Sequence, residues 1–69
     1  MNMKLKLEMR KDSIRNRISE LCEEIRIINQ SDEYIRIKLY NRMISNIRLV
    51  KDLNLRLKMI DVELSIYHS

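Results

Sequence analysis

The chain lacks glycine and proline altogether, and its 69 residues also include no alanine, threonine, phenylalanine or tryptophan. Glycine and proline are the strongest local signals for a turn or a break, so their absence argues against a fold with many tight turns. Such a chain favours a few long elements joined by one tight connection. Helices are the simplest of these, and the composition predicts an all-α protein.

The missing residue types have a second explanation, which stays open at this stage. Glycine, alanine and proline use G/C-rich codons, whereas the abundant isoleucine, asparagine, lysine and methionine use A/T-rich ones. An A/T-biased genome, as in many viruses, phages and some bacteria, produces the same composition. The folding consequence is the same in both cases, and small size with this bias suggests a viral or mobile-element protein.

Single cysteine and histidine residues exclude an internal disulfide and a structural zinc site. A core of roughly 70 residues supplies little stability by itself, so oligomerisation is the remaining way to complete it. We therefore expect one helical domain over 1–69 that forms a homo-oligomer, a dimer or higher.

The balance of 45% hydrophobic and 35% charged residues is too apolar for disorder and too charged for a membrane span. No apolar run approaches the roughly 18 residues of a transmembrane helix, and the N-terminus has no signal-peptide core. We expect a soluble protein of the cytoplasm, or of the host-cell interior if viral, with no membrane partner.

Two apolar seams predict two helices, because every step along each seam is three or four residues. The first predicts a helix over 13–29, capped by Asp12 and Ser13 or running back to about residue 4. The second predicts a helix over about 32–67. The first seam is Ile14, Ile18, Leu21, Ile25 and Ile28, and the second is Ile37, Tyr40, Ile44, Ile47, Val50, Leu53, Leu57, Ile60, Leu64 and Tyr67.

The only convincing break lies at Asn29–Glu33, where Asn29 or Gln30 can take the left-handed conformation and Ser31 can cap the next helix. A hairpin folded there places residue i of the first helix opposite about residue 61 − i. The second helix then extends past the first by about one heptad or more.

The overhang and a second apolar stripe predict a homo-oligomer interface at the open end, the end of the hairpin away from the turn. The second stripe is Leu55, Met59, Val62 and Ile66, and Leu5 and Met9 lie opposite the first seam. The predicted interface residues are Leu5, Met9, Leu53, Leu57, Met59, Ile60, Val62, Leu64, Ile66 and Tyr67.

The segment Met3–Arg10 also alternates apolar and polar residues, as a half-buried strand does. Read so, the order strand, helix, turn, helix resembles the ribbon-helix-helix DNA-binding family. That resemblance implies strands paired across a dimer, with Lys4, Lys6 and Glu8 facing DNA and Leu5 and Leu7 facing the core.

Charge is unevenly distributed: 1–17 carries +4, 18–33 carries −4, 34–58 carries +6 and 59–69 carries −2. At the turn end the acidic and basic charges largely cancel, whereas basic residues concentrate at the open end. They form either a solvated face or a nucleic-acid patch. The candidate nucleic-acid residues are Lys4, Lys6, Arg10, Lys11, Arg15, Arg56 and Lys58.

No residue pattern indicates catalysis, a metal or another cofactor. The Glu20, Glu23 and Glu24 cluster lacks histidine partners, and Cys22 is predicted to be a buried, inert side chain beside the first seam. The sequence therefore predicts a non-enzymatic helical interaction protein, a regulator, adaptor or inhibitor of a protein partner. A nucleic-acid-binding regulator is the alternative, as a basic bundle or a ribbon-helix-helix-like dimer.

Overall fold

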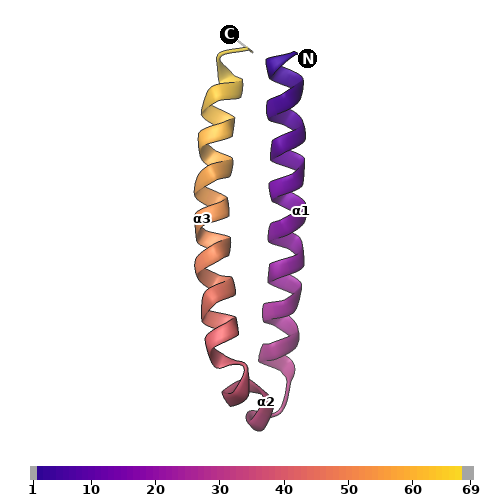
Figure 1. Cartoon of the computed structure of the whole chain (residues 1–69), viewed down its shortest axis with the longest axis vertical. Coiled ribbons are helices and arrows are strands. Elements are labelled where there is room, and N and C mark those ends of the chain that lie inside the picture. The colour runs from indigo at the N-terminus through magenta and orange to yellow at the C-terminus, as the bar shows by residue number, and fades with distance from the viewer. Residues whose placement is uncertain (1, 68–69) are drawn as a thin grey trace.

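The chain forms a long helical hairpin in a computed structural model that describes residues 2–67 (Figure 1). Helix α1 spans Met3–Gln30, the short α2 spans Glu33–Lys38 and α3 spans Tyr40–Ser65. The described residues are 91% helical, and the molecule measures 51 × 16 × 15 Å. The predicted all-α hairpin is confirmed.

The N-terminal segment is helical, so the first helix does run back to about residue 4 and the alternative of a strand there is wrong. Residues 3–9 are the first turns of α1, and no strand occurs within 2–67. Asn2 caps the helix, because its side-chain oxygen accepts a hydrogen bond from the Lys4 N–H at 2.8 Å. Lysine, leucine and methionine are good helix formers, and without a strand the ribbon-helix-helix reading fails.

The predicted break falls in the right place but uses different chemistry. Ser31 ends α1 in an extended conformation, and its hydroxyl donates to the Ile27 carbonyl at 2.7 Å. Asp32, and not Ser31, caps α2 by accepting from the Ile35 N–H at 3.0 Å. No residue in the described part has a positive φ, so the left-handed turn expected at Asn29 or Gln30 is absent.

The predicted continuous second helix is interrupted at Leu39, where φ is −103° and ψ is 13°. The Leu39 N–H bonds the Ile35 carbonyl at 2.9 Å, and the Met43 N–H bonds the Leu39 carbonyl at 3.0 Å. The surrounding isoleucines and tyrosines are weak helix formers, so interrupting the helix at Leu39 costs little stability. Residues 31–39 thereby become a compact connector (Figure 1).

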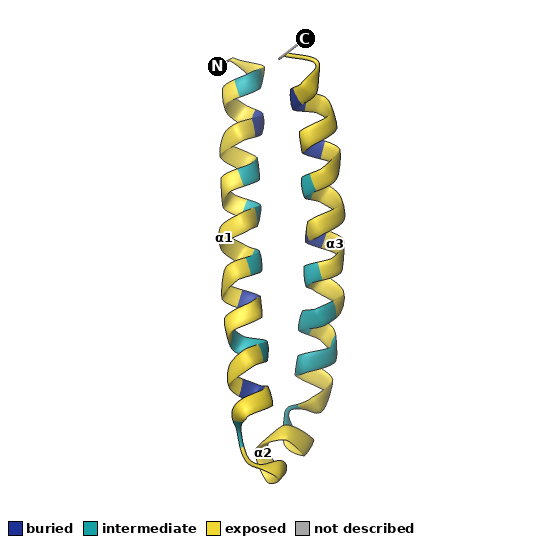
Figure 2. Cartoon of the chain, turned by 180° about the vertical axis from the view of Figure 1, so that it is seen from behind, coloured by how far each residue is buried: buried dark blue, intermediate teal, exposed yellow. Residues whose placement is uncertain are grey.

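The core is a single seam between α1 and α3. Buried and half-buried residues lie along the facing sides of these helices, while their outer faces are exposed (Figure 2). Leu7 packs with Ile60 and Leu64, and half-buried Ile14 packs against this cluster. Positions 7, 14, 21 and 28 recur every seven residues, the spacing of helices packed side by side. The buried side chains, 3–8% exposed, are Leu7, Leu21, Ile28, Leu53, Ile60 and Leu64.

The register differs from the predicted one, and within residues 2–67 the second arm does not extend past the first by a heptad. Residue 50 was the expected neighbour of Lys11, yet Lys11 contacts Asp61; residue 37 was expected for Glu24, yet Glu24 contacts Arg42. The shift has a simple cause: the connector takes residues 31–39 out of the second arm. Helix α3 therefore begins later and pairs with α1 along its whole length (Figure 1).

Candidate interaction surfaces

Four of the predicted interface residues lie inside the hairpin. Leu53, Ile60 and Leu64 are buried, and Leu57 is half-buried on the same face of α3. The register shift places α1 opposite them, so they already have apolar partners within one chain. They belong to the intramolecular core, and the surface available to a partner is smaller than the sequence predicted.

The outer face of α3 carries an exposed apolar row, which we call the outer stripe. Its steps of four, three and four residues place it about 180° around the helix from the core seam. Apolar rows of this kind usually pack against another helix. The outer stripe comprises Leu55, Met59, Val62 and Ile66, which are 58%, 60%, 68% and 70% exposed.

The remaining predicted interface residues do not extend this stripe into one surface. Leu5 and Met9 are exposed, but they lie on the side of α1 directed away from α3. They therefore share the open end with the outer stripe on an opposite side of the hairpin. Tyr67 is also exposed, just past the last turn of α3.

Charged residues flank the outer stripe on both sides. Arg56 and Glu63, seven residues apart, share one flank, and Lys51 and Lys58 share the other. Arg56 Nε lies 3.2 Å from Asp52 Oδ2 along the helix. A shallow depression of about 400 Å³ adjoins the first flank, and it is lined by Arg10, Ile14, Arg56, Met59, Ile60 and Glu63.

The predicted nucleic-acid residues are divided by the fold. Lys11 lies on the inner face and its Nζ pairs with Asp61 Oδ1 at 2.6 Å. Lys4 is also half-buried, and Arg10 and Arg56 share a depression with Glu63. The other candidates, Lys6, Arg15 and Lys58, are exposed. The structure thus gathers no single basic surface from all seven residues.

The ion pairs of the turn half lie mostly within one helix. Glu23 pairs with Arg26 and Glu20 with Arg17 within α1, and only Glu24 reaches across to Arg42 of α3. The Arg42 guanidinium first, and the neighbouring Asn46 amide second, lower the pKa of the Glu24 carboxyl below its ordinary value. Likewise the Arg26 guanidinium lowers the pKa of Glu23.

Asn46 is a polar residue in the α3 core seam, because it stands one heptad before Leu53 and two before Ile60. Its Nδ2 atom is buried and makes no hydrogen bond of ordinary geometry. A single seam asparagine typically lowers stability while it favours one alignment of the helices. The seam predicted from the sequence did not include Asn46, because only apolar residues were assigned to it.

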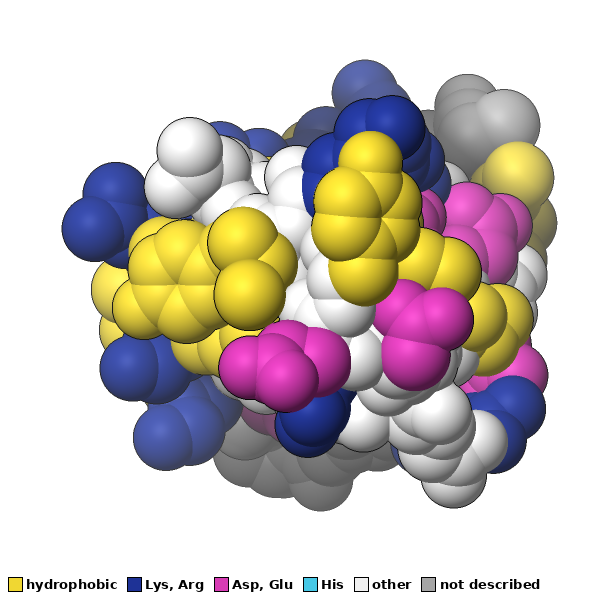
Figure 3. All heavy atoms as spheres, turned by 90° about the horizontal axis from the view of Figure 1, so that it is seen from below, with side chains coloured by type: hydrophobic (Ala, Val, Ile, Leu, Met, Phe, Trp, Pro, Cys, Tyr) yellow, Lys and Arg dark blue, Asp and Glu magenta, His cyan; other side chains and the backbone are white. Residues whose placement is uncertain are grey.

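The turn end presents a second apolar surface, which the sequence reasoning missed. Tyr34, Ile37 and Tyr40 are 72%, 69% and 55% exposed, although Ile37 and Tyr40 were predicted to lie in the seam. The break at Leu39 rotates them outward. Apolar side chains gather on this end in Figure 3, next to both basic and acidic groups.

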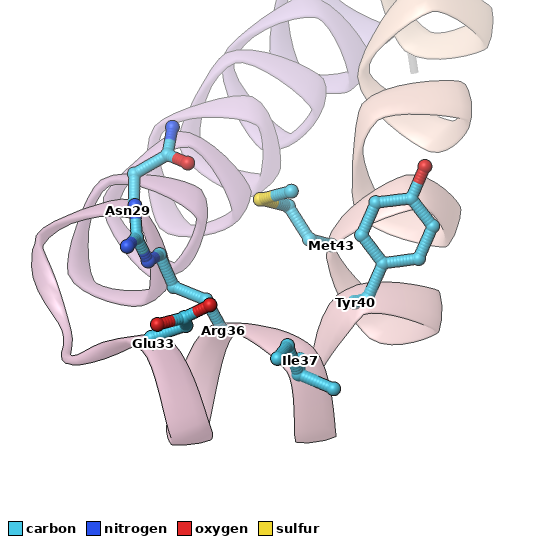
Figure 4. Close-up of a pocket in the computed structure, with 6 residues that line it drawn as sticks. All are labelled: Asn29, Glu33, Arg36, Ile37, Tyr40 and Met43. Atoms are coloured by element: carbon cyan, nitrogen blue, oxygen red, sulfur yellow. The ribbon is translucent and has the colours of Figure 1, made fainter.

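A depression of about 470 Å³ lies at this end between α1, α2 and α3, with Met43 directed into it (Figure 4). Beside it, the Lys38 ammonium lies 5.8 Å from the centre of the Tyr34 ring. Exposed tyrosines are common where proteins bind each other. Its lining residues are Asn29, Glu33, Arg36, Ile37, Tyr40 and Met43.

Cys22 is exposed, so its predicted burial is wrong: it lies one position past buried Leu21, outside the seam. Within residues 2–67, no group of three or more histidine, cysteine, aspartate and glutamate side chains could hold a metal ion. In the same part of the chain, no helix combines the length and apolar character that crossing a membrane requires.

Comparisons with protein-family models, curated proteins and solved structures find no match to this chain. Its function must therefore be argued from the surfaces described above.

Proposed function

We propose that the chain is a non-enzymatic helical interaction protein that self-associates through the outer stripe of α3. The observation that carries this proposal is the exposure of Leu55, Met59, Val62 and Ile66 in one helical row. Packing this row against another apolar surface removes it from water, which stabilises an assembly by roughly 25 cal/mol per Å² of apolar area. In this arrangement the exposed turn end remains available for a protein partner.

The small intramolecular core supports the same proposal. Within residues 2–67, six residues are buried, whereas the outer stripe together with Tyr34, Ile37 and Tyr40 exposes seven large apolar side chains. A two-helix seam of this size gives limited stability, and small domains commonly gain the remainder by association. Self-association would cover the outer stripe without disturbing the α1–α3 seam.

Sedimentation equilibrium of the intact chain tests the proposal across about 1 µM to 1 mM, the range of moderate affinities. We expect a reversible oligomer that Val62→Glu converts to monomer, because burying an unpaired carboxylate is unfavourable. Asn41→Glu is the matched control, since Asn41 is exposed on the same helix outside the stripe. Circular dichroism verifies folding in both. A Val62→Glu protein that associates like the parent contradicts the proposal.

A nucleic-acid-binding role is a second candidate, favoured by the start of α1. Its first turn contains no acidic residue but includes Lys4 and Lys6, which oppose the positive end of the helix dipole. An anionic partner would relieve this opposition. Binding of duplex DNA or RNA should weaken steeply with salt and weaken further in Lys6→Gln, with Lys51→Gln as control. Absence of binding at about 50 mM salt eliminates this candidate.

A further inference from the structure

We propose that two copies of the chain pair in antiparallel orientation through their outer stripes, with the two-fold axis crossing α3 between Met59 and Val62. This inference rests on the proposed self-association and specifies its partner and geometry. The partner is a second copy of this chain, and the contact is an isologous helix pair.

The spacing of the outer stripe is self-complementary in this orientation. An axis between residues 60 and 61 places Met59 opposite Val62 of the second copy, and Leu55 opposite its Ile66. Leu55 and Val62 share one heptad position, and Met59 and Ile66 share the other. Each apolar layer then joins one residue from each of the two positions, as the layers of antiparallel helix pairs do. Each of the four exposed side chains then faces an apolar side chain of the second copy.

The flanking charges agree with the same orientation. Arg56 and Glu63 occupy equivalent flanking positions one heptad apart, so antiparallel pairing brings Arg56 beside Glu63 of the second copy. By symmetry this opposite-charge contact occurs twice in the dimer. On the other flank, Lys58 lies beside Ser65 of the second copy, which is neutral. No like charges therefore face each other along the edges of the stripe.

A parallel pairing fits these charges less well. It would place Lys51 of one copy beside Arg56 of the other, and Lys58 beside Glu63. The first contact is repulsive and also occurs twice. Charge complementarity therefore selects the antiparallel arrangement, because like charges at flanking positions disfavour a pairing.

The stripe also limits how far the contact extends. Toward the turn, the outer face continues with polar residues, among them Arg48 and Asp52, so the apolar contact covers only the open half of α3. The turn ends of the two copies then point in opposite directions, and the apolar surface of Tyr34, Ile37 and Tyr40 remains exposed in each copy. An interface of this length belongs to the small class, and the dimer should dissociate on dilution.

Charge reversal tests the pairing by sedimentation equilibrium at low salt. Arg56→Glu should weaken the dimer by about tenfold, because two attractive contacts become repulsive, and Glu63→Arg should do the same. The double variant R56E/E63R should restore association to within about threefold of the parent. Circular dichroism confirms that each variant keeps its helices.

The outcomes separate this inference from the proposed function. Tighter association of Arg56→Glu indicates the parallel pairing, since it removes the contact with Lys51, and overturns the inference. Failure of the double variant to recover also overturns it, while self-association itself stands. A parent chain that stays monomeric across the whole concentration range overturns both.

Discussion

Lys11 of α1 and Asp61 of α3 form an ion pair across the open half of the hairpin, with Lys11 Nζ 2.6 Å from Asp61 Oδ1. Lys11 occupies a seam position, because it stands seven residues before Ile18 and fourteen before Ile25. A lysine there can reach the edge of the seam with its ammonium group while its stem covers apolar surface. The pair is thus a specific polar contact that favours this alignment of α1 against α3.

Replacing this lysine by an apolar residue should stabilise the hairpin. Lys11→Leu fills the seam beside Ile14 with apolar surface, and we expect it to raise the free energy of unfolding by about 1 kcal/mol. Asp61→Asn should lower it by less than about 1 kcal/mol, since both side chains are partly exposed. Urea unfolding followed by circular dichroism measures both. A larger loss in Asp61→Asn than in a core truncation such as Leu21→Ala would contradict this assignment.

Asn46 should be a site where stability can be gained. Its Nδ2 is buried and makes no hydrogen bond of ordinary geometry, although the amide lies near the Glu24 carboxylate, so Asn46→Leu should raise the free energy of unfolding by about 1–2 kcal/mol. Asn54→Leu, at an exposed position of the same helix, is the matched control and should change it by less than about 0.5 kcal/mol. Destabilisation by Asn46→Leu in thermal melts would mean that the contact of the amide with Glu24 outweighs the cost of burying the amide.

The Glu24–Arg42 pair should add an acid-dependent component to stability. Because the pKa of Glu24 is lowered in the folded chain, its contribution is fully present above the ordinary carboxyl value of 4.5 and is lost as pH falls below it. The difference in melting temperature between the parent and Arg42→Gln should therefore shrink from pH 7 to pH 3. A difference that stays constant over this range would show that the pair does not contribute in this way.

Identical truncations distinguish the observed seam from the one expected on sequence alone. Ile28 is 3% exposed and Ile37 is 69% exposed, so Ile28→Ala should lower the free energy of unfolding by about 2–4 kcal/mol. Ile37→Ala should change it by less than about 0.5 kcal/mol. Similar losses in the free energy of unfolding at both positions, measured by urea unfolding, would mean that Ile37 lies in the core and that the helix continues through Leu39.

Sequence periodicity predicted the helices and the site of reversal, because apolar spacing and cap residues are local signals. It did not predict the break at Leu39, where neither glycine nor proline marks a change of direction. That single omission shifted the register, assigned Leu53, Ile60 and Leu64 to an interface, and concealed the exposed turn end. The outer stripe could be recognised in the sequence as a second apolar row, since its spacing does not depend on the register, and its role as an interface stays a prediction.

A single distance between two copies tests the antiparallel pairing most directly. A nitroxide label at residue 48, in a Cys22→Ser background that removes the exposed native thiol, reports the separation of the two labels by pulsed electron resonance. With the axis between residues 60 and 61, the account predicts a separation of roughly 37 Å along the helices. A separation near 10 Å, the interaxial distance of parallel helices in register, would contradict it.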